Sequence, residues 1–233
     1  EKNKNLVGKQ FSEKIERNIF IAWFKENASI VSAVYHIGAR TDTTEFDSAI
    51  FDELNLNYSK DLWRISADNK LPFMYASSAA TYGMGEFGFE DNHEVVEKLL
   101  PLNPYGDSKN DFDKWALKQD SQPPFWAGFK FFNVYGPNEF HKSRMASVIF
   151  HAVKQINTTG GMKLFRSHNP KYKDGEQLRD FVYVKDVVEV LTFMMQAKKQ
   201  SGLYNLGSGK ARTFNALVNA TFTALGKENT ISY

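Results

Sequence analysis

Apolar and polar positions along the chain alternate between two periods, and they predict strands and helices in turn. The runs 30–39, 71–76 and 126–132 are short and mostly apolar, with many β-branched and aromatic residues, which is typical of buried strands. Between them apolar residues recur at helical spacing, as in the helix expected after Asn103-Pro104. Strands that alternate with helices predict an α/β fold with a doubly wound, Rossmann-like parallel sheet.

This regular alternation stops near residue 133. Shorter strands and polar loops follow, and we therefore expect a second, smaller α/β lobe beside the main sheet. The expected dinucleotide-binding domain comprises residues 1–132 and 182–209, and the expected substrate-binding lobe comprises residues 133–181 and 210–233. We expect both parts to be incomplete.

Composition excludes several classes of function. The 29 Lys and Arg nearly balance the 27 Asp and Glu without forming a basic stripe, which argues against nucleic acid as a partner. The chain has no cysteine, so it has no disulfide framework and no thiolate chemistry. No apolar run approaches the roughly 18 residues that span a bilayer, so we expect a soluble protein with no membrane partner. The five histidines lack the spacing of metal ligands, so no metal site is expected.

A serine pair and a tyrosine–lysine pair are the candidate chemistry. Ser77-Ser78 follow the strand 71–76 at its carboxyl end, where open α/β sheets bind ligands. Tyr105 and Lys109 are four residues apart on a predicted helix, so their side chains point the same way. A neighbouring ammonium favours the phenolate over the phenol, whose ordinary pKa is about 10, and this would make Tyr105 a base. The alternative is a snorkelling lysine beside a half-buried tyrosine.

Three motifs give the chain a family resemblance. Ser77-Ser78-x-x-x-Tyr-Gly, Tyr105-x-x-x-Lys and Phe132–Pro137, in this order, resemble the extended short-chain dehydrogenase/reductases, which include the nucleotide-sugar epimerases and dehydratases. Further segments are similar to the bacterial ADP-heptose 6-epimerase family; they are His36–Ala39, Thr43–Glu45, Tyr75–Gly83, His141–Val148 and Arg179–Val184.

This resemblance implies an isomerase that converts ADP-D-glycero-D-manno-heptose to its L-glycero epimer at C6, for the inner core of lipopolysaccharide. It implies a transient ketone formed with bound NADP, with NAD as the other possible cofactor, and an acid/base on each face of the carbonyl. Tyr105 is implied for one face and Lys142 for the other, while Ser78 would stabilise charge on the reacting oxygen. The other interpretation is that Lys142 is an ordinary charged residue in a loop.

Ligand contacts are also implied by the resemblance. Lys109 would hold the nicotinamide ribose and tune Tyr105. The other cofactor-binding residues would be Arg17, Ile37, Gly38, Ala39, Arg40, Thr41, Asn55 and Val134. The substrate-binding residues would be Asn133, Arg144, His151, Phe165, Arg166, Ser167, His168 and Arg179. Arginine suits a diphosphate because its fork binds phosphate oxygens in pairs.

Family members form closed homo-oligomers, so a homo-oligomer, by resemblance a pentamer, is expected in the bacterial cytoplasm. The pattern G-x-x-G-x-x-G, which opens such folds and binds the pyrophosphate, does not occur in the sequence. We expect that unit and the last elements of the substrate lobe to lie outside these 233 residues.

Two other functions remain open at this point. One is a different nucleotide-sugar epimerase or dehydratase, although dehydratases usually carry Asp-Glu where this chain has Ala80-Thr81. The other is a non-catalytic dinucleotide-binding scaffold on the same fold. Such scaffolds commonly lose the tyrosine or the lysine, and both are present here.

Overall fold

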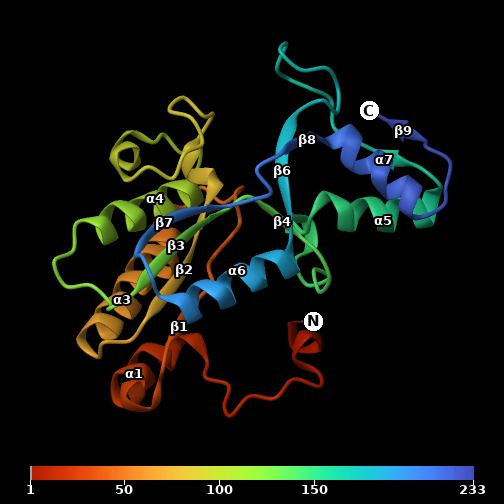
Figure 1. Cartoon of the computed structure of the whole chain (residues 1–233). Coiled ribbons are helices and arrows are strands. Elements are labelled where there is room, and N and C mark those ends of the chain that lie inside the picture. Colours follow the sequence, from red (N-terminus) through yellow and green to blue (C-terminus); the bar gives the residue numbers. More distant parts are fainter. Residues whose placement is uncertain (1) are drawn as a thin grey trace. The chain divides into compact units, whose positions relative to one another are not determined.

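The computed structural model describes residues 2–233. Its α-helices are α1 (Arg17–Asn27), α2 (Ser48–Phe51), α3 (Tyr58–Asp68), α4 (Pro104–Leu117), α5 (Val148–Thr159), α6 (Val184–Ala197) and α7 (Phe214–Ala224). Its strands are β1 (Val34–His36), β2 (Phe73–Ser78), β3 (Trp126–Phe131), β4 (Asn133–Tyr135), β5 (Met162–Lys163), β6 (Leu178–Tyr183), β7 (Gly202–Leu206), β8 (Ala211–Thr213) and β9 (Ile231–Ser232). Figure 1 shows these elements along the chain.

The chain divides into two compact units. Unit 1 comprises the N-terminal residues up to Gly8, Phe132–Val188 and Gly207–Tyr233, and unit 2 comprises Lys9–Phe131 and Glu189–Leu206. Their junction at residues 131 and 132 lies next to the boundary expected from the sequence. The assignment of dinucleotide and substrate binding to the two parts stays a prediction.

Unit 2 is built on a four-stranded parallel sheet with the order β1-β2-β3-β7. His36 pairs with Tyr75, and Ser78 pairs with Phe131, so the carboxyl ends of β1, β2 and β3 meet at one edge. The predicted α/β fold with a parallel sheet is therefore confirmed, and the serine pair lies at the edge where such sheets bind ligands.

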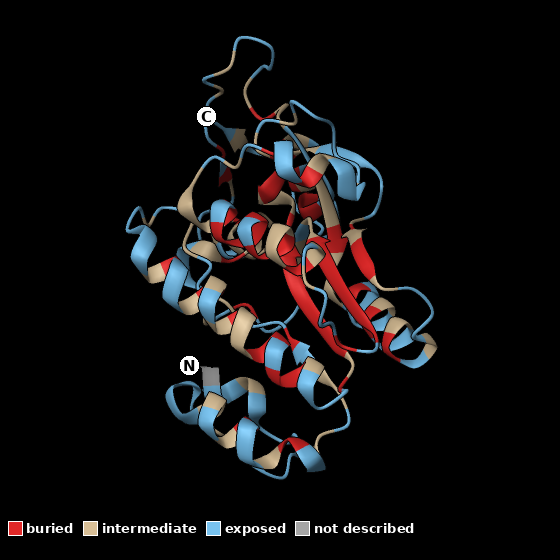
Figure 2. Cartoon of the chain, turned by 90° about the vertical axis from the view of Figure 1, so that its left-hand side faces the viewer, coloured by how far each residue is buried: buried red, intermediate tan, exposed pale blue. Residues whose placement is uncertain are grey.

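An aromatic core joins α3 and α4 to this sheet. The indole of Trp63 on α3 lies edge-on to the rings of Phe73, Phe112 and Trp126, with centroids 5.2–6.2 Å apart. All four side chains are buried, and removing each large apolar side chain from water contributes about 1.5–3 kcal/mol. Figure 2 shows the buried residues concentrated in the strands and in the helix faces that pack on them. This core fixes α4 against the strand that carries the serines.

The start of α4 follows from its sequence. The side chain of Asn103 accepts a hydrogen bond from the backbone N–H of Gly106 at 2.9 Å, and Pro104 occupies the first turn. Gly106 is required for close packing, because a Cβ there would lie 2.8 Å from Pro101 and 3.0 Å from the carbonyl oxygen of Ala80. The cap therefore sets the helix register that places Tyr105 in its first turn.

Unit 1 contains the shorter strands. β4 and β6 are parallel, β6 and β8 are antiparallel, and β5 pairs with β9. Helices α5 and α7 pack together through buried residues; these are Ala152, Ile156, Met162, Leu164, Phe214, Val218 and Phe222. The smaller α/β lobe expected from the pattern is thus present as a set of short sheets with two helices.

The strand predicted over residues 30–39 is much shorter than expected, since β1 covers only Val34–His36. Ile30 ends a 3-10 helix at Ala28–Ile30. After His36 the backbone turns out of the sheet, because the N–H of Ile37 donates to the carbonyl of Tyr35 at 3.1 Å and not to a neighbouring strand. Beyond this turn, the buried side chain of Asn55 pairs with both the N–H and the carbonyl of Arg40.

Candidate active site

Ser78 ends β2 and begins the next turn. Its hydroxyl accepts a hydrogen bond from the N–H of Ala80 at 3.1 Å, which caps a short 3-10 helix at Ala79–Tyr82. Its carbonyl accepts a hydrogen bond from the hydroxyl of Thr81 at 2.9 Å. Ser78 is 9% exposed, and the backbone N–H of Ala80 holds its hydroxyl at the carboxyl edge of the sheet.

Tyr105 lies beside this serine. The two side chains share a hydrogen bond, which lowers the pKa of the phenol, but burial has the larger effect and raises that pKa above its ordinary value. The ring of Phe51 packs edge-on against Tyr105 with centroids 6.4 Å apart. The structure thus brings together the predicted serine and the predicted tyrosine.

Lys109 is buried one turn further along α4. Its ammonium donates a hydrogen bond to the carbonyl of Ala76 at 2.7 Å. Burial lowers the pKa of Lys109 to about 8, while the charge of Asp113 acts in the opposite direction. The expected lowering of the Tyr105 pKa by Lys109 is not found, because burial of the phenol raises it and Lys109 is directed to the backbone of β2. The ribose-binding role of Lys109 stays a prediction.

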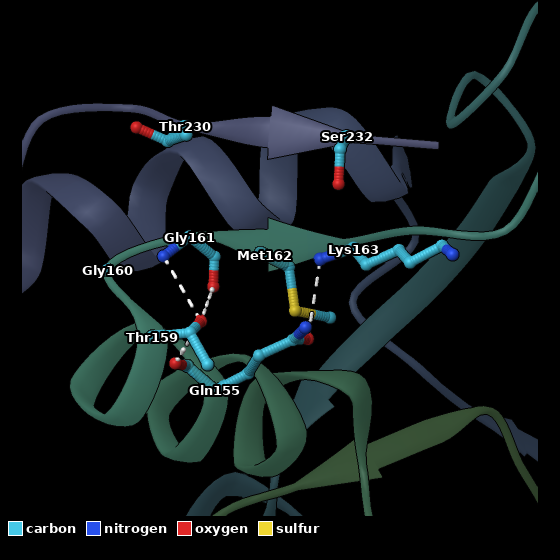
Figure 3. Close-up of a pocket in the computed structure, with 8 residues that line it drawn as sticks. All are labelled: Gln155, Thr159, Gly160, Gly161, Met162, Lys163, Thr230 and Ser232. Atoms are coloured by element: carbon cyan, nitrogen blue, oxygen red, sulfur yellow. Dashed lines mark hydrogen bonds between the residues drawn. The ribbon is translucent and has the colours of Figure 1, made fainter.

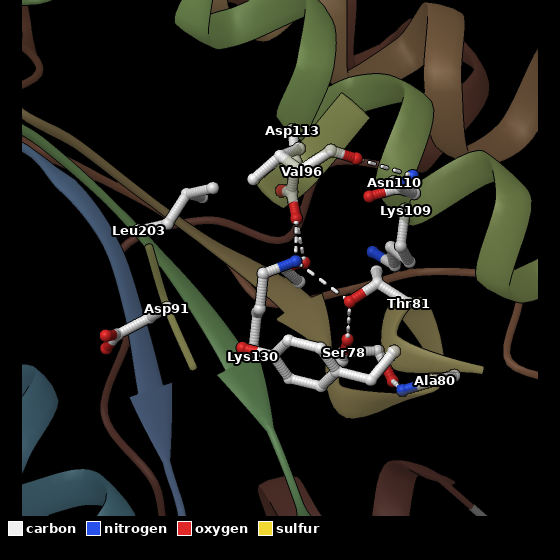
Figure 4. Close-up of polar contacts among 12 residues, drawn as sticks. Ser78, Ala80, Thr81, Asp91, Val96, Lys109, Asn110, Asp113, Lys130 and Leu203 are labelled. Atoms are coloured by element: carbon white, nitrogen blue, oxygen red, sulfur yellow. Dashed lines mark hydrogen bonds and ion pairs between the residues drawn. The ribbon is translucent and has the colours of Figure 1, made fainter. Parts of the chain in front are cut away.

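A buried carboxylate, that of Asp113, lies one turn further along α4, and Figure 4 shows its contact with Lys130. Asp113, on α4, accepts hydrogen bonds from the hydroxyls of Tyr75 at 2.8 Å and Ser77 at 2.7 Å. It also forms an ion pair with Lys130 of β3 at 2.7 Å, and the Lys130 ammonium donates to the hydroxyl of Thr81 at 2.8 Å. Both members of the ion pair are fully buried, and their hydrogen bonds supply the partners that buried charges need.

This network ties the end of β2 to α4 at several points. The hydroxyls of Tyr75 and Ser77 donate to Asp113, and the carbonyl of Ala76 between them accepts a hydrogen bond from Lys109. The distance between Ser78 on the strand and Tyr105 on the helix is therefore fixed by side-chain contacts as well as by the aromatic core. The sequence analysis did not identify Asp113 or Lys130. A signal was present, since Asp113 lies four residues after Lys109 and Lys130 interrupts an apolar strand.

Five of the predicted cofactor residues form the segment after β1. Ile37, Gly38, Ala39, Arg40 and Thr41 leave the sheet at its carboxyl edge, and Asn55 holds the backbone of Arg40 at 2.8 and 3.0 Å. The amide of Asn55 also donates to the hydroxyl of Ser108 on α4 at 3.1 Å. No atom lies within 4 Å of the position of a Cβ on Gly38. An open backbone directly after a strand of the parallel sheet fits the approach of a nicotinamide nucleotide.

The other predicted cofactor residues lie on separate elements. Arg17 begins α1, and its charge acts on Tyr58, whose pKa is raised by burial and lowered in part by this arginine. Val134 lies in β4, paired with Val182.

Lys142 lies in the loop between β4 and α5 of unit 1. Its ammonium forms an ion pair with the carboxylate of Glu139 at 3.7 Å. The Lys142 side chain is 42% exposed, whereas that of Glu139 is 5% exposed. Glu139 is a further residue that the sequence analysis did not identify.

Two predicted substrate residues meet at one ring. Phe165 packs edge-on against Phe214 with centroids 4.9 Å apart, and the guanidinium of Arg179 lies 5.9 Å from the centre of the same ring. Ser167 is held by Asp174, which accepts from its N–H at 2.6 Å. The remaining predicted residues are exposed or half-buried on β4, the loops and α5; they are Asn133, Arg144, His151, Arg166 and His168. Their ligand contacts stay predictions.

Two cavities lie within unit 1. One, of about 320 Å³, lies between α5 and the β5–β9 pair (Figure 3), and it contains none of the candidate residues; it is lined by Gln155, Thr159, Gly160, Gly161, Met162, Lys163, Thr230 and Ser232. The other, of about 80 Å³, is lined by Val134–Glu139, Lys142 and Val184. The smaller cavity therefore includes a predicted cofactor residue and the predicted second acid/base.

Two other kinds of site are absent from the described part of the chain. Within residues 2–233 no helix is long and apolar enough to cross a membrane. The same residues contain no group of three or more histidines and carboxylates arranged to hold a metal ion.

Comparison with known proteins identifies relatives over almost the whole chain. A model described as the NAD dependent epimerase/dehydratase family matches residues 16–207. The ADP-L-glycero-D-manno-heptose-6-epimerase of Fusobacterium nucleatum subsp. nucleatum is 50% identical over 224 residues, which cover 94% of this chain and 68% of that protein. The protein with the same name from Nitratidesulfovibrio vulgaris is 46% identical over 235 residues, covering 100% of this chain and 72% of the relative.

Solved structures agree with this placement. The Helicobacter pylori ADP-L-glycero-D-manno-heptose-6-epimerase superposes with a TM-score of 0.83 at 30% identity, covering 98% of this chain and 70% of that one. The Thermus thermophilus UDP-glucose 4-epimerase complex with NAD has a TM-score of 0.73 at 24% identity, covering 93% and 68%, and supports the fold alone. The chain therefore belongs to the NAD dependent epimerase/dehydratase family and, within it, groups with the ADP-L-glycero-D-manno-heptose-6-epimerases, which are isomerases.

Proposed function

We propose that the protein interconverts the two C6 epimers of ADP-glycero-D-manno-heptose, through a ketone at C6, with NADP as its bound cofactor. The observation that carries the proposal is the hydrogen-bonded pair of Ser78 and Tyr105 at the carboxyl edge of a parallel sheet, in a chain 50% identical to a heptose epimerase. The proposal includes action as a homo-oligomer, by resemblance a pentamer, in the bacterial cytoplasm. The lipopolysaccharide inner core is the expected destination of the product.

Residues of the chain would handle the protons of this reaction. The nicotinamide, when bound, would supply the acceptor and the donor of the hydride at the carbinol carbon. Because Ser78 and Tyr105 share a hydrogen bond, one substrate oxygen can contact both hydroxyls. The raised pKa of Tyr105 keeps the phenol protonated near neutral pH, so it can donate a proton as the ketone becomes an alcohol. Ser78 would stabilise negative charge on the same oxygen.

The opposite face of the carbonyl needs its own acid/base. Lys142 is proposed for that role, because it is an exposed amine anchored by a buried carboxylate, in the segment that resembles the heptose epimerases. In one direction Lys142 would take the hydroxyl proton as the alcohol is oxidised, and Tyr105 would give its proton as the ketone is reduced; in the other direction the two residues exchange these roles. Lys109 and Asn55 would hold the nucleotide at the edge of the sheet. Arg179 beside the ring of Phe214 is proposed for the diphosphate of the substrate.

Replacement of Tyr105 by phenylalanine tests the proposal. The full-length Tyr105→Phe variant should lose about 10²- to 10⁴-fold in kcat, because the acid/base is removed while the ring remains. The dinucleotide should still copurify with the variant. Turnover is measured by the conversion of one epimer to the other, and mass spectrometry of the nucleotide released on denaturation distinguishes NADP from NAD.

Tyr204→Phe is a matched control, because that hydroxyl donates only to the carbonyl of Gln200, at 2.8 Å, on an edge strand. Its turnover should equal that of the wild type. Unchanged turnover in Tyr105→Phe would remove the phenol from the mechanism. Turnover of UDP-sugars in place of the ADP-heptose would assign the protein to another branch of the family.

A further inference from the structure

The carboxylate of Glu139 has more partners than a loop charge requires. One oxygen accepts hydrogen bonds from the N–H of Gly136 at 3.1 Å and from the hydroxyl of Ser147 at 2.7 Å. The other accepts from the N–H of Ser147 at 2.8 Å and forms the ion pair with Lys142 at 3.7 Å. With 5% of its side chain exposed, Glu139 is a nearly buried anion whose partners all lie in one loop.

These contacts hold both ends of the segment from Gly136 to Ser147. Gly136 directly follows β4, and Ser147 is the N-cap of α5, where its hydroxyl accepts from the N–H of Phe150 at 3.2 Å. The carboxylate therefore joins the residue that leaves the strand to the residue that starts the helix. Lys142 lies between these two fixed points.

The backbone of the segment does not relax to an ordinary conformation. Asn138 and Ser143 have φ angles of 72° and 50°, in the left-handed region that disfavours non-glycine residues. Within it the N–H of Lys142 donates to the carbonyl of Glu139 at 2.9 Å, and the N–H of Met145 donates to the carbonyl of Lys142 at 3.0 Å. Such a conformation persists only where contacts hold it, and the Glu139 carboxylate supplies four of the contacts of this segment.

A lysine side chain by itself is a poor choice for a positioned acid/base. Its four-carbon stem samples many rotamers, and the Lys142 side chain is 42% exposed. A fixed anion at 3.7 Å from the ammonium limits where that ammonium goes. The position of a catalytic group matters steeply, since a displacement of about 1 Å can cost roughly 100-fold in rate.

We propose that Glu139 is a positioning residue, whose buried carboxylate fixes the loop and directs the Lys142 ammonium to the place where it exchanges a proton with the sugar oxygen. This inference rests on the proposed function, in which Lys142 serves one face of the C6 ketone and Tyr105 the other. It follows that loss of the Glu139 charge impairs the step at one face and spares the step at the other.

The experiment separates the two faces. Full-length enzyme with its oxidised cofactor is mixed with one C6 epimer or the other, and formation of reduced nicotinamide is followed by its near-ultraviolet absorbance in a single turnover. Lys142→Met identifies the epimer whose oxidation depends on the lysine. Glu139→Gln keeps the size of the side chain and an acceptor oxygen but removes the charge.

Glu139→Gln should slow oxidation of that same epimer by about 10- to 100-fold, with KM changed by less than about twofold and with the other epimer close to wild type. Glu139→Asp keeps the charge and should recover part of the rate. Glu228→Gln, an exposed carboxylate of the same unit, should match the wild type. Asn5→Ala removes another contact of the loop, to the carbonyl of Asn138 at 3.2 Å, and it should not produce the asymmetry between epimers.

Three results overturn the inference. If Glu139→Gln slows the oxidation of both epimers equally, the carboxylate supports the structure in general and not Lys142 in particular. If Glu139→Gln slows neither oxidation while Lys142→Met slows one, Lys142 needs no anchor at Glu139. If Lys142→Met changes neither rate, the proposed role of Lys142 fails and the positioning role fails with it. If Glu139→Gln unfolds below the assay temperature, Glu139→Asp is measured in its place. The inference then requires Glu139→Asp to slow the oxidation of one epimer only, and equal slowing of both epimers refutes it.

Discussion

Single residues at the candidate site owe their ionisation states mainly to burial. Burial raises the pKa of Tyr105 because it penalises the phenolate, and it lowers the pKa of Lys109 to about 8 because it penalises the ammonium. It also lowers the pKa of His36 to about 3, with a further contribution from the charge of Lys109. Burial thus shifts the pKa of all three groups. It raises the pKa where the deprotonated form is charged and lowers it where the protonated form is charged.

His36 makes a pH dependence of stability measurable. Its pKa is about 3 in the folded protein and 6.5 ordinarily, so the unfolded chain binds the extra proton between these values. Stability from this group is fully present above pH 6.5 and is lost as the pH falls toward 3. At pH 5, about 1.5 pH units below the ordinary value, the loss amounts to about 2 kcal/mol.

Urea unfolding of the wild type and of His36→Gln at pH 7 and pH 5 measures this loss. The glutamine can keep the contact with the hydroxyl of Ser59, which lies 2.8 Å from the histidine ring nitrogen. Between pH 7 and pH 5 the free energy of unfolding of the variant should fall by about 2 kcal/mol less than that of the wild type. His168→Gln, at an exposed position, should behave as the wild type does. Equal losses in all three proteins would show that His36 is not the titrating group.

At the scale of elements, α4 organises the candidate site of unit 2. Its first turn carries Tyr105, its second carries Lys109, and its third carries Asp113, all on the stripe that faces the sheet. The ion pair from Asp113 to Lys130 links this helix to β3, and the hydroxyls of β2 complete the network. The helix, and the two strands it contacts, therefore hold Ser78 and Tyr105 as one rigid arrangement.

Removal of one member of this buried pair should be costly. Lys130→Met leaves Asp113 charged and without its ion-pair partner, and we expect it to lower the free energy of unfolding by about 3–5 kcal/mol. Lys118→Met, whose pair with Glu97 at 2.6 Å is on the surface, should leave the free energy of unfolding nearly unchanged. Chemical denaturation compares the two variants. Equal effects would mean that the Lys130–Asp113 pair contributes no more than a surface contact.

At the scale of the whole molecule, candidate residues are divided between the two units. Unit 2 carries Ser78, Tyr105, Lys109 and Asn55, and unit 1 carries Lys142 and the proposed substrate residues. The proposed dinucleotide contacts also include Val134 of unit 1. A nucleotide that binds the folded protein and not the unfolded chain should raise the stability of the fold that binds it.

Removal of the dinucleotide from full-length protein should lower its melting temperature. By mass action, a ligand present at 100 times its Kd stabilises the folded state by about 2.7 kcal/mol. NADP added back should restore the melting temperature at lower concentration than NAD. A melting temperature unaffected by either nucleotide would contradict the proposed cofactor, while a stronger response to NAD would correct only its identity.

Much of the fold could be predicted from the sequence. The alternation of apolar runs with helical periods gave the parallel sheet, and Asn103-Pro104 gave the start of α4, because caps and periodicity act over a few residues. The sequence also predicted that Ser78 and Tyr105 lie near each other. Ser78 is at the carboxyl end of a strand, and Tyr105 is in the first turn of the helix that packs on that strand. The expected strand over residues 30–39 was too long, because the N–H of Ile37 bonds the carbonyl of Tyr35 and the backbone turns out of the sheet there.

The sequence by itself determined the order of elements and the residue types available for chemistry, because these depend on local spacing and on which side chains avoid water. Tertiary structure alone decided which charges lie together. The pairing of Asp113 with Lys130 and the burial that raises the pKa of Tyr105 come from segments far apart in the chain. The contacts of Glu139 with Gly136 and Ser147 span a shorter stretch, but they too depend on how the loop closes, which local spacing does not determine.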